Sequence, residues 1–309
     1  MVAPPGFEPR SGGPEPPMLD HYTTGLCVAP KSASVFFIFS VRKQTRRFFY
    51  KTTQLDHYDL KMPLWSELTH GNFKEIASET EVVVMVTGAL EAHGKHLPLG
   101  TDTILPDSLG SQIAKRTNAL VLPAIPFGES WSFDQYDGTI SIQSDVLTGY
   151  YESIMRAIFK HGFHYVVVLN GHGGNDPILR QAARKATQEG ERTVVIVNWW
   201  RDLAKSAREL VEETPGGHAA EDETSEVMHV RPDLVDMTVA EAHRIETRFT
   251  IVSGAYRKDL LPSAVYGDPR KASEEKGKVI MEQAEKELVE LINQLEQGQL
   301  PVEKTRFQP

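Results

Sequence analysis

Three short segments of the sequence concentrate histidine and carboxylate side chains. The first, residues 91–103, carries Glu91, His93, His96 and Asp102 in a stretch that also contains two glycines and a proline. Carboxylates and imidazoles at this density are typical ligands of zinc, manganese or iron. If the segment is extended, side chains two residues apart, such as Glu91 and His93, point the same way and can reach one site. A solvated polar turn has a similar composition, so this segment alone leaves both interpretations open.

The second segment, Asn170–Asn175, has the sequence Asn-Gly-His-Gly-Gly-Asn and places His172 among glycines. It offers one imidazole, backbone amides and room for a ligand to approach. A glycine-rich loop before a helix can also cradle phosphate, so an anion or nucleotide loop is an alternative. Neither G-x-G-x-x-G nor G-x-x-x-x-G-K-[ST] is present. A tight turn with an incidental histidine is the third interpretation.

The third segment, His218–Ser225, is rich in acidic residues. On a helix His218, Glu221 and Ser225 would share one face, because positions three, four and seven apart stack above one another. An ordinary solvated first turn, in which acidic side chains favour the helix dipole, is the competing interpretation.

Buried strands precede the first two segments. Val82–Thr87 and Tyr165–Leu169 are apolar, β-branched runs typical of parallel strands covered on both faces. Strands and helices alternate, which predicts a three-layer α/β/α domain with a mainly parallel sheet. In such sheets ligands bind beyond the carboxyl ends of the strands. The other expected strands are Ala119–Ile125, Thr139–Ile142 and Thr193–Asn198, and the expected helices are Ile104–Arg116, Ser144 or Asp145 to Gly162, Pro177–Gln188 and Gly267–Gln297.

Composition excludes several classes of protein. The 309 residues include 33 Lys and Arg against 42 Asp and Glu, a net charge of −9, which argues against a nucleic-acid partner. Cys27 is the single cysteine, so no internal disulfide can form, which fits a cytoplasmic location. The apolar run Val35–Val41 is too short for a membrane span of about 20 residues. Basic residues follow this run, whereas a signal peptide carries them before it, so we expect no membrane partner.

The first 61 residues differ from the rest, because seven of the 19 prolines fall within residues 1–30. The apolar residues there show neither helical nor strand periodicity. We therefore expect residues 1–61 to be a disordered extension, or to result from a start codon assigned too early. Residues 62–300 are expected to form a single domain, and residues 301–309 to be a tail. An N-terminal arm that docks on a neighbouring subunit is the alternative.

Together the three segments resemble the creatininase (creatinine amidohydrolase) family. Gly88–Asp102 matches G-x-x-E-x-H-G-x-H-L-P-L-G-T-D, and Asn170–Asn175 matches N-G-H-G-G-N completely. His218–Ser225 is similar to H-A-G-E-x-E-T-S, with Ala220 in place of the usual glycine. The similarity runs from about Met62 to Asp236 in the right order and spacing. It implies a creatininase-like fold and a homo-oligomer, since family members commonly form hexamers.

The resemblance also implies a hydrolase site with two divalent ions, which could be zinc, manganese or iron. Water activated there cleaves the C–N bond of an amide. In this assignment Glu91 and His172 hold one ion, His93 and Glu221 hold the other, and Asp102 bridges them. His218 shuttles a proton to the leaving amine, and Glu223 orients His218 or a water. Substrate-binding or supporting roles fall to His96, Asn170, Gly173, Gly174 and Asn175.

Two departures from creatininase proper bear on the substrate. That enzyme carries N-G-H-Y-E-N, whose glutamate binds metal, where this chain has Gly173 and Gly174, and Thr214 stands where it has a tryptophan. The pattern is more similar to branches that deformylate a formamidopyrimidine nucleotide or trim a peptide. We therefore expect a metal-dependent amidohydrolase that cleaves a non-peptide C–N bond in a small polar substrate, such as a formamide or cyclic amide. The alternatives are a creatinine amidohydrolase, a metallopeptidase of the same family, and a non-catalytic anion- or nucleotide-binding module.

Overall fold

The computed structural model describes residues 64–302, and its centre is a parallel sheet of four strands in the order β2-β1-β3-β4. The strands are β1 (Val82–Thr87), β2 (Leu120–Val121), β3 (Tyr165–Asn170) and β4 (Thr193–Asn198). β1 and β3 pair in register along their whole length, and so do β3 and β4. Thr87, Asn170 and Asn198 therefore end level with one another, and the segments after these strands emerge at one edge of the sheet.

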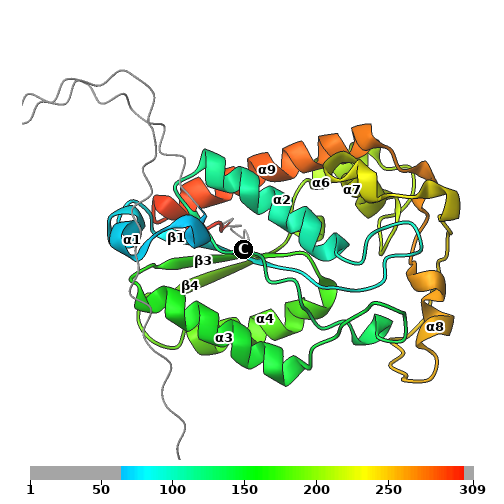
Figure 1. The fold of residues 1–309 in the computed structure, drawn as a ribbon, viewed down its shortest axis with the longest axis horizontal. Coiled ribbons are helices and arrows are strands. Elements are labelled where there is room, and N and C mark those ends of the chain that lie inside the picture. The colour runs from blue at the N-terminus through cyan, green and yellow to red at the C-terminus, as the bar shows by residue number, and fades with distance from the viewer. Residues whose placement is uncertain (1–63, 303–309) are drawn as a thin grey trace, which may run out of the picture. The chain divides into compact units, whose positions relative to one another are not determined.

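Helices cover both faces of this sheet, as Figure 1 shows. α3 and α4 lie on one face, and α2 and α9, together with α6 and α7, lie on the other. The three-layer α/β/α class predicted from the sequence is confirmed. The helices are α1 (His70–Ala77), α2 (Thr101–Arg116), α3 (Ser144–Lys160), α4 (Asp176–Ala186), α5 (Trp199–Asp202), α6 (Lys205–Val211), α7 (Glu221–Val230), α8 (Arg257–Leu260) and α9 (Glu274–Glu296).

Strand β1 shows why the layers form. Its residues Val82, Val84 and Val86 belong to the core beneath α2 and α9, whereas Val83 and Met85 belong to the core beneath α3 and α4. All five are fully buried. Because successive side chains of a strand point to opposite faces, a continuous β-branched run requires cover on both sides.

Several boundaries differ from those predicted. α2 begins at Thr101 rather than Ile104, which places Asp102 in its first turn. The strand expected over 119–125 is limited to Leu120–Val121, since Pro123 and Pro126 follow and cannot donate to a ladder. Residues 139–142 make only isolated bridges rather than a strand. The last helix begins at Glu274, where the Ser273 hydroxyl accepts a hydrogen bond from the backbone N–H of Lys276.

The expected extension, residues 1–61, lies outside the described part of the chain, as does most of the expected tail. Within residues 64–302 no helix is both long and apolar enough to cross a membrane.

Candidate active site

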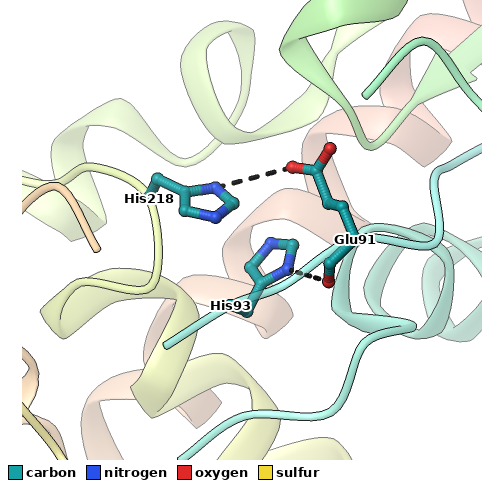
Figure 2. A group of neighbouring side chains, drawn as sticks. All are labelled: Glu91, His93 and His218. Carbon is teal, nitrogen blue, oxygen red and sulfur yellow. Dashed lines mark hydrogen bonds and ion pairs between the residues drawn. The ribbon is translucent and has the colours of Figure 1, made fainter. Parts of the chain in front are cut away.

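The three polar segments meet at the carboxyl edge of the sheet. Glu91 and His93 follow β1, Asp102 lies at the start of α2, and His172 follows β3. All four side chains are buried, with Glu91 and His93 fully so. His218 reaches the same place from the segment before α7, and Figure 2 shows its ring beside His93 and facing the carboxylate of Glu91. Side chains more than 100 residues apart in the sequence thus converge on one buried site.

Asp102 stands at the centre of the site. Its Oδ1 lies 3.0 Å from Nε2 of His93, and its Oδ2 lies 2.9 Å from Nδ1 of His172. Three groups of potential metal-binding atoms lie within 4.8 Å of one another, and Asp102 belongs to two of them. These groups are Glu91, Asp102 and His172; His93, Asp102 and Glu223; and Glu91, His93 and His218. A carboxylate with one oxygen in each of two neighbouring groups is placed to bridge two ions.

Each imidazole of the site has one ring nitrogen fixed by a backbone carbonyl, and its other nitrogen faces carboxylates. An N–H on that fixed nitrogen identifies the tautomer, because a carbonyl can only accept. When the ring is neutral, the second nitrogen presents its lone pair, which is the arrangement that metal-binding histidines adopt. The fixed pairs are His93 Nδ1 with Glu91 O at 3.1 Å, His172 Nε2 with Glu129 O at 2.6 Å, and His218 Nε2 with Ala92 O at 2.8 Å.

The electrostatics favour a cation. Burial acts to lower the pKa of His93, but Asp102, Glu223 and Glu91 outweigh it and raise that pKa to about 10. Burial also acts to lower the pKa of His172, but Glu91 and Asp102 outweigh it and raise that pKa to about 10. Burial raises the pKa of Glu91 to about 7. The carboxylates thus hold positive charge strongly at these two imidazoles, and a metal ion can supply the charge in place of protons.

The site also passes a test of fit for a metal. Both carboxylate oxygens of Glu91 are buried and have no hydrogen-bond partner among residues 64–302. Oε1 faces the ring nitrogens of His172 and His218, at 3.4 and 3.7 Å. Buried polar atoms are nearly always hydrogen-bonded, and a bound ion would satisfy these oxygens. Oxygen and imidazole nitrogen together suit zinc, manganese or iron.

Glu221 has a different place from the one expected. Its buried carboxylate accepts hydrogen bonds from Lys276 Nζ at 2.6 Å and from the backbone N–H of Thr214 at 2.7 Å. It belongs to none of the three groups. Glu223 is the acidic residue of α7 that reaches the site, with Oε2 3.7 Å from Nε2 of His93. Because α7 begins at Glu221, two residues turn the side chain by about 200°, to nearly the opposite face.

His218 precedes α7 and therefore does not share a helical face with Glu221 and Ser225. Its ring stacks on Phe133, with centroids 4.1 Å apart and an interplanar angle of 17°, and its other side meets His93. Burial and the neighbouring His93 lower the pKa of His218 well below its usual range, so the ring is neutral at pH 7. Its Nδ1 lies 3.7 Å from Oε1 of Glu91.

The supporting residues hold the loops in place. His96 is buried, and its Nε2 pairs with the hydroxyl of Thr224, the neighbour of Glu223, at 3.0 Å. Asn170 donates to the carbonyl of His172 at 2.7 Å. Asn175 donates to the carbonyl of Gly88 at 3.0 Å, which ties the loop after β3 to the loop after β1.

Gly174 lies where no side chain fits. A Cβ atom there would stand 2.2 Å from the carbonyl oxygen of Glu129 and 2.5 Å from Nε2 of His172. With this backbone, the position cannot carry the glutamate that occupies it in N-G-H-Y-E-N. Ala220, by contrast, has φ −94°, so its replacement of the family's glycine costs no left-handed strain.

A cavity of about 550 Å³ opens over these residues. Several residues that line the cavity were not predicted from the sequence, among them Phe133, Trp200 and Arg208. Trp200 follows β4, whose end lies at the same sheet edge, so its position after a predicted strand could have indicated that it lies near the site. Phe133 ends a short 3-10 helix, Trp131–Phe133, between the expected strands 119–125 and 139–142, and no feature of the sequence marks it.

Comparison with known proteins decides the family. The family model described as Creatininase: Creatinine amidohydrolase matches residues 66–292. The chain belongs to the creatininase family. As a member of it, the protein is a metal-dependent hydrolase.

Relatives of known function act on different substrates. The chain is 28% identical to the creatinine amidohydrolase of Pseudomonas putida, over 70% of this chain and 90% of that protein. It is 29% identical to the mycofactocin precursor peptide peptidase of Mycobacterium ulcerans (strain Agy99), over 72% of this chain and 89% of that protein. A solved structure described as creatininase Mn superposes with a TM-score of 0.68 at 25% identity, covering 75% of this chain and 98% of that one. A creatininase variant described as Zn-Zn type gives a TM-score of 0.68 at 26% identity, with the same coverage.

Proposed function

We propose that the protein hydrolyses the C–N amide bond of a small polar substrate at a site for two divalent ions. The observation that carries this proposal is the position of Asp102, whose Oδ1 faces His93 and whose Oδ2 faces His172. Family membership alone leaves the substrate open, since the relatives differ in what they act on.

The geometry supports one ligand set for each ion. Glu91, Asp102 and His172 would hold the first, and His93, Asp102 and Glu223 the second. Glu223 therefore takes the role that the resemblance had implied for Glu221. Zinc, manganese and iron all suit these donors, and the creatininase structures similar to this one are described with Mn and with Zn. When bound, the two ions supply an activated water and polarise the substrate carbonyl.

His218 is the proton carrier in this proposal. Its Nε2–H is fixed on the carbonyl of Ala92, so Nδ1 carries the lone pair and faces the site. A neutral ring can take a proton at Nδ1 and then give it to the departing nitrogen, which is a poor leaving group without it. Phe133 and His93 hold the ring from its two faces. Glu91 lies next to Nδ1 and stabilises the charged ring once the proton has arrived.

The cavity suits a compact polar substrate. Its volume of about 550 Å³ lies within the usual range for small-molecule sites of about 300–1,000 Å³. Gly173 lines the cavity beside His172 with no side chain to narrow it, and Trp200 lines the cavity on the side of β4. Formamides and cyclic amides are the proposed substrate class, and the double glycine favours the formamide branch over creatinine. We propose a homo-oligomer, with a hexamer as the expected size, located in the cytoplasm.

A substrate panel tests the proposal. Metal-loaded protein is incubated with N-formyl amines, cyclic amides including creatinine, and short unblocked peptides, and amine release is measured. Turnover of the formamides above the other classes is the expected result. A protein that retains no metal after dialysis and turns over none of these compounds would instead be a binding module.

A further inference from the structure

A small groove lies beside the active-site cavity and shares a wall with it. Its volume is about 200 Å³, and Ser132 lines both spaces. The lining residues include Trp131, Ser132, Ile245, Ile251 and Arg257, and the guanidinium of Arg257 lies over the Trp131 ring, 4.4 Å from its centroid. The shared wall places the groove within reach of a molecule that extends from the metal site past Ser132.

Part of the groove is lined by the loop of residues 244–258, which runs into the first turn of α8 and exposes large apolar side chains. Phe249 is 71% exposed, Val252 78% and Tyr256 63%, and Ile245 and Ile251 are exposed as well. Single exposed apolar residues are common on proteins, but several in one short segment favour an interaction site. Two of them, Ile245 and Ile251, also line the groove.

The same loop is basic in a chain that is acidic as a whole. Residues 244–258 contain four Arg or Lys and one Glu, a net charge of +3, whereas the chain carries −9. Arg257 forms an ion pair with Asp134 at 2.5 Å, and Arg244 forms one with Glu246 at 3.1 Å.

Two cations of the loop have no acidic partner within the described residues. Arg248 and Lys258 make no ion pair among residues 64–302; their charged groups lie over the rings of Phe249 and Tyr136, at 5.1 and 4.8 Å from the ring centroids. Arg248 follows Thr247 and Lys258 follows Arg257 in the chain, and Thr247 and Arg257 both line the groove. Exposed cations on aromatic rings favour an anionic ligand with an apolar part.

We infer that the groove and loop 244–258 bind the far end of the amide substrate, and that this end carries an acidic group and an aromatic or aliphatic group. The inference rests on the proposed function, since the reacting bond is placed at the metal centre. The substrate class is then an N-acyl or N-formyl amine long enough to pass Ser132, with a carboxylate or phosphate in reach of Arg248 and Lys258. The apolar part packs against Phe249 and the groove.

Matched formylated probes test the inference. The metal-loaded enzyme is given N-formyl-Gly-Phe-Glu amide, N-formyl-Gly-Phe-Lys amide and N-formylglycinamide, and KM and kcat for formate release are measured. The acidic probe should show a KM about tenfold below that of the basic probe, since charge complementarity improves binding. The double variant Arg248→Glu with Lys258→Glu should abolish or reverse this preference. N-formylglycinamide, which lacks the acidic and apolar groups, reports the reaction at the metal centre alone. Lys278→Glu, an exposed charge reversal on α9, is the matched control and should change none of these values.

The outcomes separate the inference from the proposed function. Calorimetric titration with the same probes reports binding even where no formate is released, and a phosphate-bearing probe in a parallel titration distinguishes the two acidic groups. Absence of turnover with selective binding of acidic probes would defeat the formamide proposal and keep the groove assignment. Equal binding of the acidic and basic probes, or an unchanged preference in the double variant, would overturn the inference. A change in sedimenting mass of the double variant would show instead that the loop joins two copies of the chain, and would overturn it too.

Discussion

Replacing Glu221 and Glu223 one at a time separates a structural carboxylate from a metal-binding one. Glu221→Gln removes the charge that Lys276 Nζ contacts at 2.6 Å and weakens the acceptor for the N–H groups of Glu213 and Thr214, at 2.9 and 2.7 Å. Breaking a buried ion pair costs about 3–5 kcal/mol. Lys276 is partly exposed and remains ion-paired with Glu213 at 2.8 Å in this variant. We therefore expect Glu221→Gln to lower the free energy of unfolding by about 2–3 kcal/mol. For a domain of this size, that corresponds to a melting temperature lower by about 4–12 °C.

The assay measures both melting temperature and metal content. Melting is followed in chelator-treated protein, so that loss of metal does not enter the comparison, and metal is measured by elemental analysis after reloading. Glu221→Gln should melt lower and bind metal normally, whereas Glu223→Gln should melt near the wild type and bind less metal. Glu213→Gln is the control, because Glu213 contacts the same lysine but is exposed, and this variant should melt near the wild type. A Glu221→Gln protein that loses an ion and keeps its melting temperature would refute this reasoning.

Three further predictions follow from the site and the sequence. His218→Ala should keep its metal and lose about 10²–10⁴ in turnover, because it lacks the proton carrier; loss of an ion would make His218 a ligand instead. In metal-free protein His93 and His172 hold protons at neutral pH, since their pKa is about 10, so metal binding should release protons and strengthen as pH rises from 6 to 9. Calorimetry in two buffers of different ionisation heat counts those protons. By linkage, the stability that these raised pKa values confer on the metal-free fold is complete below pH 6.5 and is lost as pH rises through about 10. A chain that starts at Met62 should keep its melting temperature and its metal; aggregation would show that the preceding residues are structural.

Much of the fold could be predicted because its strands are buried on both faces. β1 and β3 are uninterrupted apolar runs, and such runs have few alternatives to a covered parallel sheet. β2 could not be delimited in this way, since its apolar residues continue past Val121 while the prolines end the ladder. The position of each strand end then predicts where the site lies, because the two motifs follow β1 and β3 directly.

The detailed roles within the third segment could not be predicted. Whether Glu221 or Glu223 faces the site depends on the residue at which α7 begins, and on the turn before it, where Ala219 has φ 52°. A shift of the helix start by two residues would exchange the two carboxylates. That start is fixed by tertiary contacts, among them Lys276 from α9, which is more than 50 residues away in the sequence. Periodicity within the segment carries no information about such a partner.

The metal content of Asp102→Ala tests the central claim most directly, because Asp102 is the one side chain shared by both proposed metal sites. Elemental analysis of wild-type protein after dialysis should find about two ions per chain, as a dinuclear site requires. Asp102→Ala should lose both ions, and His93→Ala, which removes a ligand of one site, should lose mainly one. Unchanged metal content in Asp102→Ala would contradict the bridging role of this carboxylate and, with it, the proposed dinuclear site.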